Sequence, residues 1–521
     1  MRLQKEILEN INKEVVEIPP IDVFELPEKV LQFGTGVLLR GLPDYFIDKA
    51  NKKGIFNGRI VVVKSTESRG ADAFDEQDSL YTLCIRGISE GKNISENNIN
   101  ASISRVISAR NDWEGVMQCA ANPEMSVIIS NTTEVGITLV KDNIHALPPE
   151  SFPGKLLAFL YQRFKVFKGD TTKGMVIIPT ELIPDNGDKL ESIVMELAHQ
   201  HGLESGFMDW LENCNHFCNS LVDCIVPGKL PAMEQQKLEE SAGYTDELMI
   251  MSEVYRLWAI ETGDEKVRET LSFSTAVKGM VLAPDIHVFR ELKLRLLNGS
   301  HTFSCGLAHL AGFKTVKEAM GNELFSSYIS KLMYSEIGQA VQDKQITKAA
   351  ADEFAANVLD RFRNTFLEHQ WLSICLQYSS KMKMRNVPLI VKYNQTTGGP
   401  GSLMSLGFAA HILFMRCKQG DDGKYYGEWN GVKYPIQDDQ AAWYSKMWNE
   451  SELELIVENI LKDEFVWGLN LSILPGFVSA VSIKLQEILQ LGVLKTLEQH
   501  LIDPKTKELY ETTGTKSSSR R

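Results

Sequence analysis

The sequence predicts an α/β protein with a Rossmann-like dinucleotide-binding domain over residues 1–287 and a mainly α-helical domain over residues 288–505. The first domain is indicated by short apolar runs that alternate with helical periods, at 29–33, 59–63, 126–130 and 174–178. Such alternation is typical of a parallel sheet covered by helices. After residue 287, long helical periods dominate, which predicts the second domain.

Length and composition agree with two soluble domains. The chain has 521 residues, of which 43% are hydrophobic and 24% charged. A net charge of −13 argues against nucleic acid or an anionic membrane as a partner. The N-terminus lacks an apolar signal core, and no apolar run reaches membrane-spanning length. We therefore expect a cytoplasmic protein that acts on a small molecule, and we leave its oligomeric state open.

A glycine turn follows the first predicted strand. Glycines at this place let backbone amides approach the pyrophosphate of a dinucleotide. The third glycine of the usual fingerprint is replaced by Leu39, so the pattern alone fits a plain tight turn equally well. The candidate cofactor-binding residues of the turn are Phe33, Gly34, Thr35, Gly36, Val37 and Arg40.

The ends of the later strands carry further candidates. An acidic residue directly after the second strand would bind the ribose hydroxyls of NAD, but Glu67 lies a few residues beyond that position. Lys64 could instead favour the 2′-phosphate of NADP, so this segment leaves the choice between NAD and NADP open. Glu134 and Asn186 follow the third and fourth strands, where polar side chains line the ligand crevice of a parallel sheet. Each of the two is alternatively an ordinary cap or turn residue.

The segment 284–301 is predicted to be a helix that carries three polar side chains on one broad face. At about 100° per residue, Asn298 lies roughly 140° from Lys293, and His301 falls between them at roughly 80°. This combination suits redox chemistry at a carbonyl. The amide stabilises a developing oxyanion, a desolvated lysine with a lowered pKa supplies a proton, and the histidine binds a neighbouring hydroxyl. The alternative is a plain amphipathic helix with a solvated lysine.

The rest of the second domain is predicted from pattern alone. Asn430-Gly431 between two aromatic-rich runs predicts a β-hairpin over 424–436, and the Ser/Thr-rich tail 506–521 is expected to be disordered. Helical periods cover 305–320, 322–343, 347–376, 402–416, 451–463 and 475–500.

A cysteine group in the first domain is a candidate metal site. Cys214, Cys218 and Cys224 enclose His216, but the spacing lacks the paired C-x-x-C hooks of a zinc site. We expect buried thiols here and no metal.

Taken together, the motifs resemble the mannitol dehydrogenase family of long-chain dehydrogenases from about residue 28 to residue 500. The resemblance is carried by K-L-R-L-L-N-G-S-H around Lys293, by Gly34, Gly36 and Arg40, by Thr133-Glu134, and by Asn219 to Asp223. It implies that Lys293 is the general acid/base, that Asn298 helps to form the oxyanion hole and that His301 binds substrate. It also implies an NAD(P) cofactor and no metal.

Departures from the family pattern narrow the expectation. Leu182 stands where polyol-acting members carry an oxyanion-binding asparagine, and Asn186 is the nearest substitute. The segments P-T-E-L-I-P-D-N-G, E-H-Q-W-L-S-I and S-S-K-M-K resemble the tagaturonate reductase branch. That branch implies NAD-dependent interconversion of D-tagaturonate and D-altronate, a ketouronate and an aldonate, in hexuronate catabolism. The candidate substrate-binding residues are Asn186, His369, Trp371 and Lys381.

Two questions stay open at this level. A uronate carboxylate requires a cation, and the available ones are Lys381, Lys383, Arg385, Arg40 and Lys64.

The alternative functions are a fructuronate reductase or a mannitol or other polyol 2-dehydrogenase, and, in another class, a dinucleotide- or sugar-binding sensor without turnover. Lys293 argues against the sensor, because a binder needs no proton donor.

Overall fold

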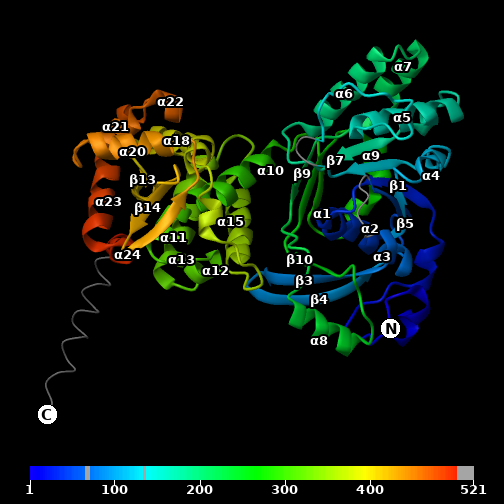
Figure 1. The fold of residues 1–521 in the computed structure, drawn as a ribbon, viewed down its shortest axis with the longest axis horizontal. Helices are drawn as coiled ribbons and strands as arrows, with labels where there is room; N and C mark the ends of the chain where they lie inside the picture. Colours follow the sequence, from blue (N-terminus) through cyan, green and yellow to red (C-terminus); the bar gives the residue numbers. More distant parts are fainter. Residues whose placement is uncertain (65–70, 133–135, 502–521) are drawn as a thin grey trace. The chain divides into compact units, whose positions relative to one another are not determined.

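The computed structural model describes residues 1–64, 71–132 and 136–501, and the chain forms two compact units, Met1–His287 and Val288–Arg521 (Figure 1). Glu67, Glu134 and the tail 506–521 therefore lie outside the described residues. Among the residues that are described, no helix is long and apolar enough to cross a membrane.

The first unit is built on a six-stranded parallel sheet, which confirms the predicted Rossmann-like fold. All four predicted strands are present in it. Both β2 and β6 pair with β1, so the direction in which the chain adds strands reverses between β1 and β6. In spatial order the strands are β5 (Ile103–Ser108), β2 (Arg59–Lys64), β1 (Glu28–Phe33), β6 (Val127–Ser130), β7 (Val176–Pro179) and β8 (His216–Phe217).

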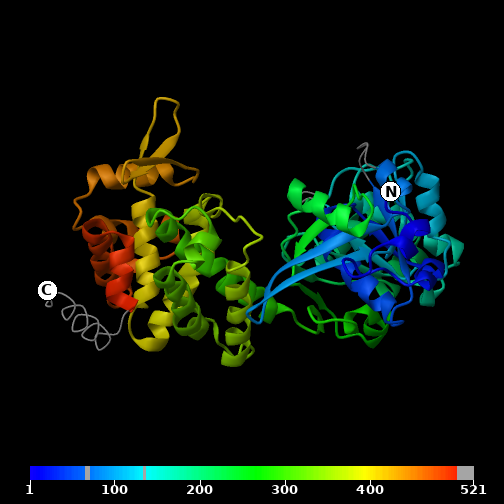
Figure 2. The same cartoon turned by 90° about the horizontal axis from the view of Figure 1, so that it is seen from below.

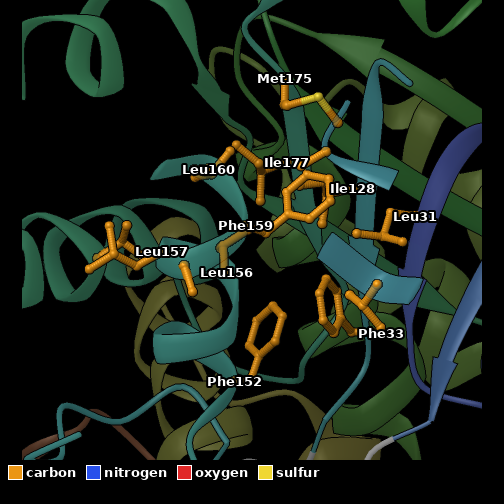
Figure 3. Packing of buried hydrophobic residues seen from close by; sticks show 14 of the residues in the cluster. Leu31, Phe33, Ile128, Phe152, Leu156, Leu157, Phe159, Leu160, Met175 and Ile177 are labelled. Carbon is orange, nitrogen blue, oxygen red and sulfur yellow. The ribbon is translucent and has the colours of Figure 1, made fainter. Parts of the chain in front are cut away.

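Alternation along β1 divides the core of this unit into two layers. Phe33 points to the face that α5 (Phe152–Val166) and α6 (Asn186–Gln200) cover, and its ring meets Phe152 at 5.1 Å between centroids (Figure 3). Val30 points to the opposite face, which packs against α2 (Pro43–Lys52). Because strand side chains alternate in this way, the sheet is buried on both sides.

Two smaller sheets and several short helices complete the first unit. The sheets have the orders β10-β3-β4 and β12-β11-β9, and β3 and β4 form the long antiparallel ribbon of Figure 2. The strands are β3 (Tyr81–Ser89), β4 (Lys92–Asn100), β9 (Ser220–Asp223), β10 (Ile250–Glu253), β11 (Leu257–Glu261) and β12 (Met280–Ala283). The remaining α-helices are α1 (Val37–Gly41), α3 (Ala71–Glu76), α4 (Trp113–Cys119), α7 (Ser205–Cys214), α8 (Ala232–Ala242) and α9 (Glu265–Thr270). Short 3₁₀ turns are η1 (Lys5–Asn10), η2 (Ile21–Glu25), η3 (Thr171–Lys173) and η4 (Ser272–Thr275).

The second unit is mainly helical, as predicted. Its α-helices are α10 (His287–Leu292), α11 (Ser300–Leu310), α12 (Val316–Met320), α13 (Glu323–Lys331), α14 (Gly338–Val341), α15 (Lys348–Phe362), α16 (Trp371–Ile374), α17 (Tyr378–Lys381), α18 (Val387–Thr397), α19 (Ser402–Phe414), α20 (Ala441–Glu450), α21 (Ile456–Leu461), α22 (Glu464–Trp467), α23 (Phe477–Leu491) and α24 (Val493–Leu501). A 3₁₀ turn, η8 (Leu471–Ile473), precedes α23.

The predicted hairpin is present as β14 (Tyr425–Trp429) and β15 (Val432–Ile436), with β13 (Cys417–Gln419) at its side (Figure 2). Asn430 and Gly431 both have positive φ, at 50° and 77°, which is the geometry that an Asn-Gly hairpin turn requires.

The prediction of one helix over 347–376 is wrong. The α15 helix ends at Phe362, and the chain is extended near His369 because its backbone pairs with another segment. The Val316 amide donates to the His369 carbonyl at 2.9 Å, and the Trp371 amide donates to the Lys314 carbonyl at 3.0 Å. These long-range hydrogen bonds replace the helical ones, so tertiary pairing overrides the local helical pattern.

Three helical segments of the second unit are π-helices. They are η5 (Lys293–Gly299), η6 (Leu332–Ile337) and η7 (Met382–Asn386), and η5 packs against both of the others. A π-helix is rare, is found mostly as a single turn inside an α-helix, and is frequent at functional sites. The part of the predicted 284–301 helix that carries Lys293 and Asn298 therefore departs from regular α-helical geometry.

Candidate active site

A pocket of about 480 Å³ opens in the first unit at the point where the strand order reverses. Phe33, Gly34 and Asn131, from the ends of β1 and β6, are among its lining residues. Gly34 has φ +127°, and a Cβ atom there would lie 3.1 Å from the Asn131 carbonyl oxygen. Only glycine is accommodated in this conformation, so the turn is fixed by the fold itself.

The second glycine of the turn has a different surrounding. Gly36 precedes α1, and a Cβ atom built on it would meet nothing within 4 Å. Thr35 and Val37 flank it and are half-buried. The open space over Gly36, next to a pocket at the strand reversal, fits the pyrophosphate of a dinucleotide.

Arg40 does not fit the prediction that it contacts the cofactor. Its side chain is buried, donates to the Leu248 carbonyl oxygen at 2.7 Å, and lies over the Tyr81 ring at 5.3 Å. Burial lowers the pKa of the guanidinium, but the Tyr81 hydroxyl and Asp44 oppose that effect. Arg40 therefore ties α1 to the segment before β10, which is a structural role.

Asn186 does not fit a ligand-facing position either. Its amide nitrogen donates to the carbonyl oxygens of Pro179, Glu181 and Ser220, and its oxygen accepts from the Ser220 amide at 2.8 Å. These backbone bonds occupy both ends of a fully buried side chain. Leu182 is 62% exposed and has no polar donor, so neither residue replaces the missing asparagine of the family pattern.

Lys293 and Asn298 lie in the π-helix η5, which changes their predicted relation. In an i→i+5 helix, residues five apart come to the same side, as residues four apart do in an α-helix. The roughly 140° that α-helical geometry predicts between them therefore does not apply. Both side chains are half-buried, whereas Leu296 and Leu297 between them are buried.

Side chains from α11 and η5 stabilise this irregular turn. The Ser300 hydroxyl donates to the Leu296 carbonyl oxygen at 2.5 Å, and the Thr302 hydroxyl donates to the Asn298 carbonyl oxygen at 2.8 Å. The Arg295 guanidinium donates to the carbonyl oxygens of Met384 and Arg385 at 2.8 Å each. Backbone oxygens near both π-turns thus gain partners from side chains, and η5 is joined to η7.

His301 lies in an aromatic cage. Its ring stacks on Phe362 at 4.0 Å and meets the rings of His369 and Trp371 edge-on at 5.3 Å and 5.9 Å. Its Nε2 atom is buried and has no hydrogen-bond partner within the part of the chain that the structure describes. A buried nitrogen without a hydrogen-bond partner is costly, so this atom is an exception to the usual pairing of buried polar groups.

The predicted substrate residues near His301 differ in exposure. His369 is exposed, and its ring faces that of His301. Trp371 is fully buried between His301 and Phe325, so it supports the histidine ring. Backbone pairing between residues 369–371 and residues 314–316 brings His369 and Trp371 next to His301. The predicted helix over 347–376 did not include this pairing.

Cations gather around the same histidine. Burial lowers the pKa of His301 well below its usual value, and the charges on His369, Arg361 and Arg385 lower it further. Lys381 contributes as well, and its Nζ atom donates to the Ile374 carbonyl oxygen at 2.9 Å. Burial followed by the charge on Arg385 lowers the pKa of Lys381 itself. Arg361 was not among the predicted site residues, because in sequence it is one more arginine of a charged helix end.

The cysteines around His216 are not all buried as expected: Cys218 is buried, whereas Cys214 and Cys224 are half-buried. In the ranges 1–64, 71–132 and 136–501, no group of three His, Cys, Asp or Glu side chains is arranged to hold a metal ion.

Comparison with known proteins places these features in a family. Residues 28–271 match the mannitol dehydrogenase Rossmann domain, and residues 285–489 match the mannitol dehydrogenase C-terminal domain. Among solved structures, the fold is similar to Pseudomonas fluorescens mannitol 2-dehydrogenase in complex with NAD and D-mannitol, with a TM-score of 0.64 and 23% identity over 97% of this chain and 100% of that one. A D-sorbitol dehydrogenase gives a TM-score of 0.73 with 17% identity, over 95% of this chain and 100% of that one.

Sequence relatives are more similar than these structures. An altronate oxidoreductase of Bacillus subtilis (strain 168) is 36% identical over 500 residues, which covers 95% of this chain and 99% of that protein. An altronate oxidoreductase of Halalkalibacterium halodurans is 36% identical over 483 residues, covering 91% of this chain and 93% of that one. With both domain models matched along most of its length, the chain belongs to the mannitol dehydrogenase family.

Proposed function

We propose that this protein is an NAD-dependent oxidoreductase that interconverts D-tagaturonate and D-altronate. The observation that carries the proposal is the group of cations that act on His301. His301 lies in α11, which directly follows the π-helix with Lys293 and Asn298. A neutral polyol requires no such charge, whereas a sugar acid does. The altronate oxidoreductases that resemble this chain over nearly its full length support the same substrate class.

The residues of η5 and α11 would act on the substrate oxygen, and NAD(H), when bound, would supply or accept the hydride. In the direction of ketone reduction, the Asn298 amide donates a hydrogen bond to the carbonyl oxygen as negative charge develops on it. The Lys293 ammonium then gives that oxygen its proton, and in the reverse direction the neutral amine removes the proton from the hydroxyl.

His301 acts as a neutral group in this scheme. Its lowered pKa keeps the imidazole uncharged near neutral pH, so the free Nε2 position binds a substrate hydroxyl without adding charge. The substrate is thereby oriented for transfer, which reduces the entropic part of the barrier.

The residues that would hold the cofactor are those of the first unit. Thr35, Gly36 and Val37 would offer backbone amides to the pyrophosphate, and Gly36 leaves open space for it. Phe33 and Gly34 border the adjoining pocket, and the Gly34 amide donates to the Val63 carbonyl oxygen at 3.0 Å. NAD is proposed over NADP on family grounds, while Lys64 at the end of β2 keeps a test with both cofactors necessary.

A substrate panel tests the proposal. Tagaturonate, fructuronate, fructose and the neutral ketose that corresponds to tagaturonate are each assayed with NADH and with NADPH, and altronate and mannitol with the oxidised forms. We expect tagaturonate with NADH to give by far the highest kcat/KM. A higher value for an uncharged ketose would assign the protein to the polyol-specific enzymes instead.

A further inference from the structure

Arg385 stands out among the cations around His301. It lies in η7, where its Nη1 atom donates to the Thr302 hydroxyl at 3.2 Å. Its Nε atom is buried and has no hydrogen-bond partner among the residues that the structure describes. A buried guanidinium nitrogen without an acceptor is costly, because water has been removed from it and nothing replaces the lost hydrogen bonds.

Other cations act near Arg385. Lys381 lies one helical turn before it, and the charge on Arg385 lowers the pKa of the Lys381 ammonium while Asp438 raises it. The charges on Arg361, Arg385 and Lys381 each lower the pKa of His301. Such an arrangement is stabilised when an anion enters it. A planar guanidinium binds a carboxylate with two parallel hydrogen bonds, which lysine does not offer.

Thr302 links this arginine to the proposed reaction centre. The Thr302 hydroxyl accepts from Arg385 and donates to the Asn298 carbonyl oxygen at 2.8 Å. Thr302 is buried and follows His301 in α11. The guanidinium is therefore held at a fixed position relative to the π-turn that carries Asn298, at the side of the turn where η7 packs.

We propose that Arg385 binds the carboxylate of the substrate and is the residue that selects sugar acids over neutral sugars. The Nε–H group donates to one carboxylate oxygen and an Nη–H group to the other, while Lys381 adds charge beside them. The inference rests on the proposed function, since it names the group that recognises a ketouronate at that same site. The proposal assigns no role in carboxylate binding to the other cations that the sequence left open, which are Lys64, Lys383 and Arg40.

The test compares a charged and a neutral substrate in each variant. The substrates are tagaturonate and the corresponding neutral ketose, in which a hydroxymethyl group replaces the carboxylate. Arg385→Met keeps a long apolar stem and removes the guanidinium, and we expect it to raise the KM for tagaturonate by about 30-fold or more. Its kcat/KM for the neutral ketose should stay near the parental value, so substrate preference moves toward the ketose.

Two further variants make the result specific. Lys383→Met removes a charge two residues away, on a side chain that donates to the Phe465 carbonyl oxygen at 3.1 Å, and it should leave both substrates unaffected. Arg385→Lys keeps the charge without the forked geometry, so its KM for tagaturonate should fall between those of the parent and of Arg385→Met. It also serves if the methionine variant fails to fold.

The outcomes separate the two claims. A parent enzyme that prefers tagaturonate, with Arg385 variants that keep this preference, overturns the role of Arg385 and leaves the proposed function standing. Equal losses for both substrates likewise overturn it, because they indicate a structural role. A parent enzyme that reduces the neutral ketose as well as tagaturonate overturns the proposed function, and the inference with it.

Discussion

Lys293 and Asn298 are the first and sixth residues of the π-helix η5, so the i→i+5 pattern brings their side chains to the same side of one turn. A regular α-helix would separate them by roughly 140°. The turn is stabilised by hydroxyls of Ser300 and Thr302 that bond to backbone oxygens of η5. An acid and an oxyanion donor on one side of a turn is what the proposed roles of Lys293 and Asn298 require.

Lys293→Ala should lower the rate of hydride transfer by about 10²–10⁴-fold, which is the usual contribution of a positioned general acid. NADH binding should change little, because the proposed cofactor turn is formed by residues of the first unit. The measurement is single-turnover reduction at saturating NADH and tagaturonate across pH, with added primary amines as a rescue. A near-parental rate with an unchanged pH profile would mean that Lys293 is a solvated residue without a role in proton transfer.

Asn298→Ala should cost about 3–4 kcal/mol of transition-state stabilisation if the amide donates to the oxyanion. Combined with Lys293→Ala, the loss should be smaller than the sum, since both groups act on one oxygen. A double-mutant cycle on kcat/KM measures the coupling. Strictly additive losses would indicate that the two side chains serve different atoms.

Gly36→Val should sharply weaken NADH binding while the fold survives. A Cβ atom at Gly36 meets nothing within 4 Å, so the branched side chain occupies only the space proposed for the pyrophosphate. Fluorescence titration with NADH and thermal unfolding together test this. Gly34→Val is the contrasting variant, because φ +127° and the nearby Asn131 carbonyl oxygen predict a loss of stability. Parental NADH affinity in Gly36→Val would contradict the assignment of the turn.

His411 should make the protein sensitive to acid. Burial lowers its pKa from 6.5 to about 3, and its Nε2 atom bonds to the Tyr444 hydroxyl at 2.8 Å. Between these pH values the unfolded chain binds a proton at this residue and the folded chain does not. Its contribution to the free energy of unfolding is therefore complete above about pH 6.5 and falls by up to about 1.4 kcal/mol per pH unit as the pH drops toward 3.

Replacement of this histidine tests that contribution. Denaturant unfolding from pH 7 to pH 4 should show a shallower loss of stability for His411→Gln than for the parent. His199→Gln, at an exposed position of α6, is the matched control and should keep the parental slope. Identical slopes in all three proteins would mean that His411 does not couple folding to protonation.

The sequence by itself determined the order of the elements and supplied the residues that are proposed for the chemistry. Apolar runs followed by a glycine turn predicted the parallel sheet, because a strand buried on both faces has to be continuously hydrophobic. Asn430-Gly431 predicted the hairpin, because few other pairs tolerate positive φ at both positions. The residues Lys293, Asn298 and His301 were identified by residue type and spacing, and the family resemblance rested on the same motif.

Only the tertiary structure decided the geometry of the site. The π-turn depends on packing between η5 and η7 and on hydrogen bonds from Arg295 to residues about 90 positions away, which local helical periodicity does not encode. The end of α15 and the position of His369 depend on backbone pairing with residues 314–316. The sequence predicted that Arg40 and Asn186 contact a ligand, whereas the structure shows both side chains buried in the core. The choice of Arg385 follows from the burial of its Nε atom, a property of packed neighbours and not of the residue alone.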